Sequence, residues 1–454
     1  MTAGQAWALG LASAGAFMIQ MDIQVVATAL VAIHRDLQAS LESLEWTIDA
    51  YLLTFAALML TAAGLGDRIG RRRTFIAGLG VFVVGSAACA LAPNAGVLIA
   101  ARALQGVGAA VVMPLSLTIL SAAFPARTRG RALGLYAGLG GVATGVGPLL
   151  GGVIAESLSW QWVFWINVPV GLLTMVLVAL RIKESRGPTK RLDPVGVALV
   201  SVGTLALVWG LARSNTAGWG SHWIVSTLVA GTVLLAAFAV WELRARAPML
   251  PMLFFRFRAF SAGNAVNVSL FAVMYGILFL VAQYFQQGLG YGPTAAGLRL
   301  MPLTGTLMLI APFAGHLADR GGERRVAAGG LALLVIGLVG LAVSVRLAPG
   351  YPAMVAPLVL LGVGASACIP AAQKAVVGAV AREEIGRASG AFSMLRILSG
   401  ALGLAVAGAV FAAAGGHESA AGFASGLVPG IVVTAAIGAL GFAAALAIPR
   451  QGIP

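Results

Sequence analysis

Long apolar stretches separated by short polar links recur from one end of the chain to the other. Each holds about twenty residues, the length that an α-helix needs to cross roughly 30 Å of hydrocarbon. The links between them are too short for a large soluble domain, so the pattern predicts an all-α integral membrane protein with fourteen spans. The expected spans are 7–33, 45–66, 74–93, 95–124, 131–155, 162–181, 193–212, 222–241, 259–285, 293–317, 326–347, 351–378, 388–412 and 424–448.

Composition and charge agree with this pattern. Hydrophobic residues make up 59% of the chain and charged residues only 10%, which is too apolar for a single soluble core. Most Lys and Arg residues lie in links that follow even-numbered spans, whereas the opposite links hold only Arg35, Arg213 and Arg346. By the positive-inside rule, the basic links and both termini face the cytoplasm. The formal net charge of +14 therefore reflects topology in the cytoplasmic membrane, and no nucleic-acid partner is expected.

An internal repeat divides the chain. GVGAAVVMP at 106–114 matches GVGASACIP at 362–370, an offset of 256 residues, and the cluster Asp67, Arg68, Gly70 matches Asp319, Arg320, Gly322 at an offset of 252. Such parallel repeats predict two six-helix bundles with a cavity between them. We expect an N-terminal bundle at 1–181, linkers with two inserted spans at 182–258, and a C-terminal bundle at 259–454.

Five motifs in order resemble the major facilitator superfamily, and within it the fourteen-helix drug/proton antiporters. The resemblance covers essentially the whole chain, although Ala63 stands where a Gly is expected and Asp49 at a position that is usually uncharged. The motifs are MDIQVVATAL (21–30), GLGDRIGRRR (64–73), LIAARALQGVGAA (98–110), GVATGVGPLLGG (141–152) and WQWVFWINVPVG (160–171).

The resemblance implies a latch on the cytoplasmic side. It places Asp67 against basic side chains and a helix N-terminus of the opposite bundle, where a carboxylate is electrostatically favoured. The resemblance supports the same role less strongly for its repeat partner Asp319. The alternative is that the arginines only anchor the topology. The expected latch residues are Asp67, Arg68, Gly70, Arg71, Asp319 and Arg320.

Glycines in the fifth expected span predict close helix packing, because small residues let helix backbones approach. The resemblance adds a role as a hinge or proton seal in exporters. The residues of this antiporter motif are Gly141, Gly145, Gly147, Pro148, Gly151 and Gly152.

Few ionisable residues lie inside the expected spans, where the bilayer makes them costly. We expect Asp22 to carry a coupling proton, Arg102 to bias its charge state, and Asp49 to be a second proton site or a contact for a cationic substrate. All three residues lie in the outer half of the membrane, so their side chains could meet if the first, second and fourth spans were neighbours. The alternative is a permanent Asp22–Arg102 pair that only fastens helices. Lys374 and Arg396 are interpreted as side chains that snorkel toward the cytoplasmic surface.

The ninth expected span carries an unusual density of polar and aromatic groups. Asn264, Asn267, Tyr275 and Gln283 are candidates to line a substrate cavity, with interhelical hydrogen bonds as the alternative.

Together these features predict a proton-coupled antiporter that exports hydrophobic or cationic drugs or antibiotics by alternating access. Two alternative functions remain: a facilitator or importer of another small organic solute, and a sensor. A membrane enzyme is disfavoured because the chain has neither HExxH nor GxSxG and its histidines are not clustered. No cofactor is expected, since no Walker A loop is present, and a single copy would suffice. The expected partners are protons, an amphipathic small molecule and the lipid bilayer.

Overall fold

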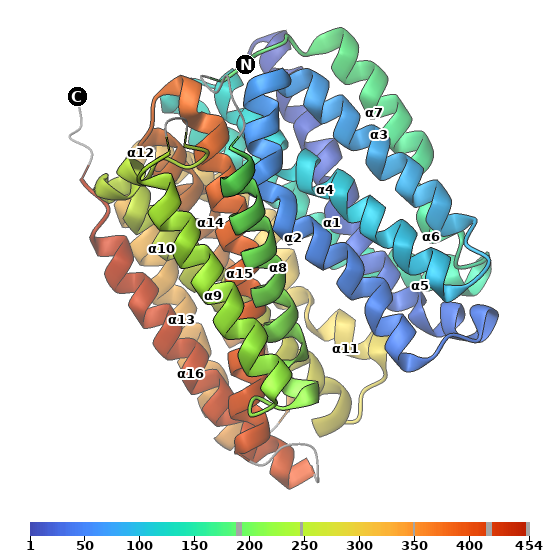
Figure 1. The fold of residues 1–454 in the computed structure, drawn as a ribbon. Coiled ribbons are helices and arrows are strands. Elements are labelled where there is room, and N and C mark those ends of the chain that lie inside the picture. The colour runs from blue at the N-terminus through green and yellow to red at the C-terminus, as the bar shows by residue number, and fades with distance from the viewer. Residues whose placement is uncertain (188–192, 246–247, 348–349, 415–419, 451–454) are drawn as a thin grey trace.

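The computed structural model describes residues 1–187, 193–245, 248–347, 350–414 and 420–450. All regular elements in these ranges are helical, which confirms the all-α class (Figure 1). Within them, 13 helices or runs of consecutive helices are long and apolar enough to cross a membrane. The expected count of fourteen spans stays a prediction.

The helices follow the expected spans closely. The first nine are α1 (Ala3–Leu37), α2 (Leu41–Ile69), α3 (Arg71–Ala90), α4 (Ala95–Ala123), α5 (Ala126–Ser157), α6 (Trp162–Trp165), α7 (Asn167–Arg181), α8 (Pro194–Ala217) and α9 (His222–Glu242). The others are η1 (Met252–Arg256), α10 (Arg258–Gln283), η2 (Tyr284–Gly288), α11 (Pro293–Arg299), α12 (Met301–Gly321), α13 (Glu323–Leu347), α14 (Tyr351–Gly378), η3 (Arg382–Glu384), α15 (Ile385–Ala413) and α16 (Ala420–Leu446).

Two expected spans are interrupted. The segment 162–181 divides between α6 and α7, and the segment 293–317 divides between α11 and α12. Hydropathy does not register such breaks, because the residues on both sides of them are equally apolar. The first break places Asn167 at the start of α7, inside the protein.

The helices associate as two groups with a pair of helices beside them. Helices α1 to α7 form the N-terminal group and helices α10 to α16 form the C-terminal group, and the two groups share an extensive contact between α5 and α12 (Figure 1). α8 pairs with α9 and lies against both α2 and α15. The expected domain boundaries at 181 and 258 stay a prediction.

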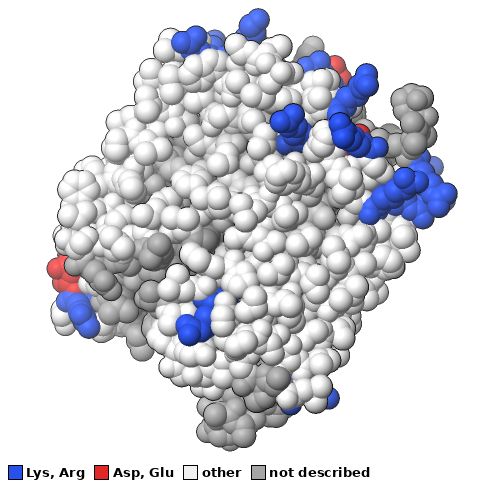
Figure 2. Space-filling model, turned by 180° about the vertical axis from the view of Figure 1, so that it is seen from behind, with Lys and Arg blue, Asp and Glu red and all other residues white. Residues whose placement is uncertain are grey.

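One end of the molecule carries most of the surface Lys and Arg residues, and we call it the basic end (Figure 2). The links from α2 to α3, from α4 to α5 and from α12 to α13 lie there. Gly70 and Gly322 occupy matching turns with φ of +125° and +82°, where an L side chain would be strained. The N-terminus of α1 and the C-terminal end of α16 lie toward this same end (Figure 1).

Glycines let the two groups touch backbone to backbone near the basic end. A Cβ atom on Gly315 of α12 would overlap the carbonyl of Gly130 in α5, and one on Gly134 would overlap the carbonyl of Ala311. The repeat-related contact joins α2 to α15, where Gly390 leaves room for the methyl group of Ala63. The unexpected Ala63 is therefore accommodated by a glycine across the interface.

We expect Gly315→Ala to destabilise the protein by about 1 to 3 kcal/mol, because the new methyl group overpacks the contact between α12 and α5. Thermal unfolding in detergent, followed by tryptophan fluorescence, measures the change. Gly329→Ala on α13 is the matched control, since nothing lies within 4 Å of its Cβ position. Equal unfolding temperatures for the two variants would contradict this packing.

Candidate functional site

A fully buried ionic network lies inside the N-terminal group. The Asp22 side chain on α1 and the Arg102 side chain on α4 are 2% and 1% exposed. Arg102 Nη1 donates to Asp22 Oδ2 at 2.6 Å, while Gln105 Nε2 and Asn167 Nδ2 each donate to Asp22 Oδ1 at 2.8 Å. The structure thus brings Asp22 and Arg102 together as expected, and it adds two amide donors that the sequence analysis missed.

The guanidinium of Arg102 is held on several sides. Its Nη1 also donates to Gln105 Oε1 at 2.6 Å, and its Nε donates to the carbonyl of Thr47 in α2 at 3.2 Å. The Tyr51 ring lies under the guanidinium, with its centroid 4.2 Å away. Cation–π contact adds to the ionic attraction here, so the position of Arg102 is fixed from both α2 and α4.

Charge balance determines what this network can do. A proton added to Asp22 would leave Arg102 charged, buried and without a counter-ion, which is strongly unfavourable in a medium of low dielectric constant. Protonation therefore favours a rearrangement that separates the two side chains or hydrates them. The site can link the charge state of one carboxyl group to the packing of α1, α4 and α7.

Asp49 lies apart from this network. Its carboxylate pairs with Arg213 of α8 at 3.2 Å, and Arg213 also pairs with Glu45 at 2.8 Å. The expected meeting of Asp49 with Asp22 and Arg102 is not observed, because α8 brings its own cation to the outer part of α2. Asp49 fastens α8 to the N-terminal group.

Asp319 joins the two groups at the basic end. Its two carboxylate oxygens accept hydrogen bonds from the backbone N–H groups of Gly130 and Arg131 in α5, at 2.9 and 2.8 Å. Lys374 Nζ lies 3.0 Å from Asp319 Oδ1 and 3.2 Å from Glu323 Oε1. Lys374 is buried in this cluster, so its interpretation as a snorkelling side chain is wrong.

Asp67 is the repeat-related acid, and its contacts differ. It pairs with Arg71 at 2.9 Å and lies against Gly386 near the start of α15, the position that matches Gly130. Arg71 in turn donates to the carbonyl of Glu383 at 3.0 Å, which connects the two groups. Asp67 Oδ2 is buried and accepts no hydrogen bond in the described part of the chain. Asp319 is therefore the more completely bonded of the two acids.

The other expected latch residues surround these acids. Arg68 and Arg320 are exposed at the basic end, as topology anchors would be. Gly70 forms the turn before α3, and its missing side chain leaves room for the Glu184 carboxylate. This carboxylate accepts hydrogen bonds from the backbone N–H groups of Arg72 and Arg73 at 3.0 and 3.2 Å.

The glycines of α5 serve two different neighbours. Gly141 faces Met308 of α12, whereas Gly147 and Gly151 lie against Gln24 and Thr28 of α1. The expected close packing is observed at these three positions. Gly145, Pro148 and Gly152 lie outside the described residues.

The four cavity candidates on the ninth expected span are not brought together. Asn264 and Gln283 are about 28 Å apart along α10 at 1.5 Å per residue. Asn264 Nδ2 donates to the Phe260 carbonyl in its own helix, and Asn267 Nδ2 to the Phe392 carbonyl of α15, both at 3.0 Å. Tyr275 packs against Gly400, and Gln283 bonds to Gln287. Only the Asn267 bond joins two separate helices as the alternative expected, so a substrate cavity along α10 stays a prediction.

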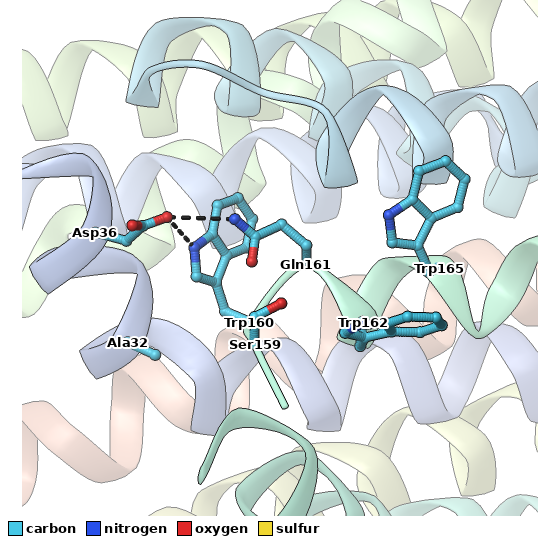
Figure 3. Close-up of a pocket in the computed structure, with 7 residues that line it drawn as sticks. All are labelled: Ala32, Asp36, Ser159, Trp160, Gln161, Trp162 and Trp165. Carbon is cyan, nitrogen blue, oxygen red and sulfur yellow. Dashed lines mark hydrogen bonds between the residues drawn. The ribbon is translucent and has the colours of Figure 1, made fainter. Parts of the chain in front are cut away.

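A hollow of about 490 Å³ opens far from the basic end, between α1 and the link into α6 (Figure 3). Asp36 lies at its edge and accepts from Trp160 Nε1 at 2.7 Å and from Gln161 Nε2 at 3.3 Å. The Trp162 and Trp165 rings line the rest of it (Figure 3). Since both donors engage the carboxylate, Asp36 holds the end of α1 to the link into α6, within a belt of interfacial aromatic residues.

The apolar helices, the paired interior charges and the short links define a polytopic α-helical membrane transporter. The family model described as Major Facilitator Superfamily matches residues 12–266 and 263–452, and the chain belongs to this superfamily. It is a transporter rather than an enzyme.

Relatives agree with this assignment. The chain is 34% identical over 401 residues to the multidrug resistance protein Stp of Mycobacterium tuberculosis, covering 88% of this chain and 74% of that protein. It is 34% identical over 412 residues to the tetracenomycin C resistance and export protein of Streptomyces glaucescens, covering 90% and 76%. The crystal structure of the human organic anion transporter MFSD10 (TETRAN) superposes with a TM-score of 0.68 at 15% identity, covering 98% of this chain and all of that one. This last likeness shows the fold alone.

We expect Asp319→Asn to speed hydrogen–deuterium exchange of the amides at 126–132 by about tenfold, because the charged acceptor of two backbone N–H groups is lost. Mass spectrometry of the purified protein measures this rate. Glu383→Gln, an exposed acid at the same end, is the matched control and should leave it unchanged. Unchanged exchange in both variants would show that Asp319 does not hold α5.

Proposed function

We propose that this protein is a proton-coupled antiporter that exports hydrophobic or cationic drugs or antibiotics across the cytoplasmic membrane. The observation that carries the proposal is the Asp22 carboxylate, buried within the membrane-spanning helices and held by Arg102, Gln105 and Asn167. An ionisable group at that depth is costly to maintain, and such groups characteristically mark proton pathways.

The proposed cycle follows from the charge balance at this site. While Asp22 is ionised it pairs with Arg102, and α1, α4 and α7 stay packed around the pair. A proton that enters from the outside neutralises Asp22 and weakens the pair. The N-terminal group then repacks, the basic end opens, and the proton leaves to the cytoplasm.

Alternating access in this proposal is rocking of two six-helix bundles, with fourteen spans and both termini in the cytoplasm. Three contacts across the basic end support a closed cytoplasmic side in this structure. Asp319 bonds to α5, Arg71 donates to the Glu383 carbonyl, and Arg382 donates to the Ala122 carbonyl at 2.6 Å. Farther from the basic end, Gly147 and Gly151 of α5 pack on α1 instead of on α12.

The direction of transport is supported by the names of the relatives, which describe resistance to drugs or antibiotics, or their export. The glycine-rich α5 resembles the antiporter motif of exporters. A membrane potential of 100 mV supplies about 2.3 kcal/mol per charge, enough for roughly a fiftyfold concentration ratio. A facilitator would need no buried carboxylate for proton coupling, and the names of the relatives favour export over import.

The proposal predicts that Asp22→Asn abolishes transport driven by a pH gradient. Purified protein in proteoliposomes is given such a gradient, and movement of the fluorescent drug ethidium is recorded. Glu42→Gln, an exposed acid at the start of α2, should transport like the wild type. Gradient-driven movement that survives in Asp22→Asn would remove Asp22 from the coupling mechanism.

A double variant separates coupling from helix fastening. Asp22→Asn leaves Arg102 buried without a counter-ion and is expected to lower stability by about 3 to 5 kcal/mol, whereas Asp22→Asn with Arg102→Gln removes both charges. We expect the double variant to regain most of the thermal stability but not the gradient-driven transport. Recovery of both properties would mean that the pair only fastens helices.

A further inference from the structure

Arg396 lies in the middle of α15, at the boundary between the two groups of helices. It is eleven residues from the start of α15, or about 16 Å at 1.5 Å per residue. Its Nη2 donates to Gln20 Oε1 of α1 at 3.3 Å. The side chain therefore extends across the interface toward the N-terminal group, and its interpretation as a snorkelling residue is wrong.

Aromatic rings accompany this guanidinium. The Phe271 ring of α10 lies 4.7 Å from its central carbon, and Tyr136 of α5 is close enough to interact with it electrostatically. Gln20 and Arg396 are both partly accessible, although they touch each other across the boundary. Because they touch across the boundary, both lie at the interface between the groups, which is where alternating access would place the transport path.

Among the residues that the structure describes, no carboxylate balances the charge of Arg396. In the described part of the chain no ion pair joins Arg396 to a carboxylate, and its Nε is buried without a hydrogen-bond partner. Several other interior charges form pairs of opposite sign. These pairs are Asp22–Arg102, Asp67–Arg71 and Asp319–Lys374.

An unbalanced guanidinium at this depth favours a counter-ion, and the described part of the chain supplies none. Its planar set of N–H donors matches the oxygens of a carboxylate or sulfonate, which can accept two parallel hydrogen bonds. Gln20 offers one neutral oxygen, a weaker acceptor that an anion could replace. The Phe271 and Tyr136 rings would contact the apolar part of the same molecule.

We propose that Arg396 is a binding residue for the acidic group of an amphipathic organic anion, carried in the interface between the two groups of helices. This inference rests on the proposed transport function, because it takes that interface as the substrate path. It changes the expected substrate class, since hydrophobic or cationic drugs offer Arg396 no counter-ion.

Two probes with the same ring and opposite permanent charge test the proposal. N-dansyltaurine carries a sulfonate and dansylcholine a quaternary ammonium group. Energy transfer from the tryptophans to the dansyl ring measures binding to the protein in phosphatidylcholine nanodiscs. We expect saturable binding of N-dansyltaurine by the wild type, preferred over dansylcholine, and at least about tenfold weaker binding by Arg396→Gln.

Three further variants keep the result interpretable. Arg396→Lys keeps the charge but not the planar set of N–H donors, so it should lose less affinity for N-dansyltaurine than Arg396→Gln does. Gln20→Ala removes the contact across the interface and should not weaken binding. Arg346→Gln, an exposed arginine at the end of α13, is the matched control. Thermal unfolding of each variant identifies any that fail to fold.

The proposal is overturned if Arg396→Gln binds N-dansyltaurine as the wild type does, or if dansylcholine is the preferred ligand. It is also overturned if Gln20→Ala loses as much affinity as Arg396→Gln, because Arg396 would then only fasten α15 to α1. Anionic phosphatidylglycerol that competes with the probe in the wild type, but not in Arg396→Gln, would identify a lipid headgroup as the source of the anion. Without competition, the source is a soluble organic acid.

Transport is measured separately, so that the two proposals can fail independently. The same probes are followed in proteoliposomes under a pH gradient. Arg396-dependent binding of N-dansyltaurine without any gradient-driven movement would refute the exporter and leave the anion site standing. Gradient-driven movement of dansylcholine alone, unaffected by Arg396→Gln, would support export and refute the anion site.

Discussion

The cost of an ionised side chain inside a bilayer governs this structure. Each interior acid that we describe lies beside a base: Asp22 beside Arg102, Asp67 beside Arg71 and Asp319 beside Lys374. Such pairs add little net stability against an apolar core, yet breaking one is strongly unfavourable. They therefore hold particular helices together in one arrangement and make any other arrangement depend on a proton or a ligand.

At the basic end, the contacts of Asp319 and Asp67 show how two halves of a duplicated chain can come to differ. Gly130 and Gly386 are related by the repeat, and an acid of the opposite group lies against each of them. Asp319 accepts two backbone N–H groups, whereas one oxygen of Asp67 is left without a donor. Since hydrogen bonds to a carboxylate are among the stronger ones, Asp319 binds α12 to α5 more strongly than Asp67 binds α2 to α15.

Sequence reasoning predicted the parts that depend on local pattern. Runs of twenty apolar residues were sufficient for the helices, whereas depth within the spans allowed Asp22 to meet Arg102 only if their helices were neighbours. It failed where a partner comes from a distant helix: nothing along the chain places Arg213 of α8 beside Asp49. The position of a residue along its span also does not say which way its side chain points. The orientation of Arg396 toward Gln20 is therefore known only from the three-dimensional structure.

The inserted pair α8 and α9 had no assigned purpose in the sequence, and its contacts supply one. α8 bonds to the N-terminal group through Arg213 with Asp49 and through Ser201 with Thr61. It bonds to the C-terminal group through Asn215, which donates to the Ala405 carbonyl at 3.3 Å. A helix attached to both α2 and α15 covers the seam between them from the lipid. Any rocking of the two groups must break one set of these contacts, and the ionic set to α2 is the stronger, so α8 would move with the N-terminal group.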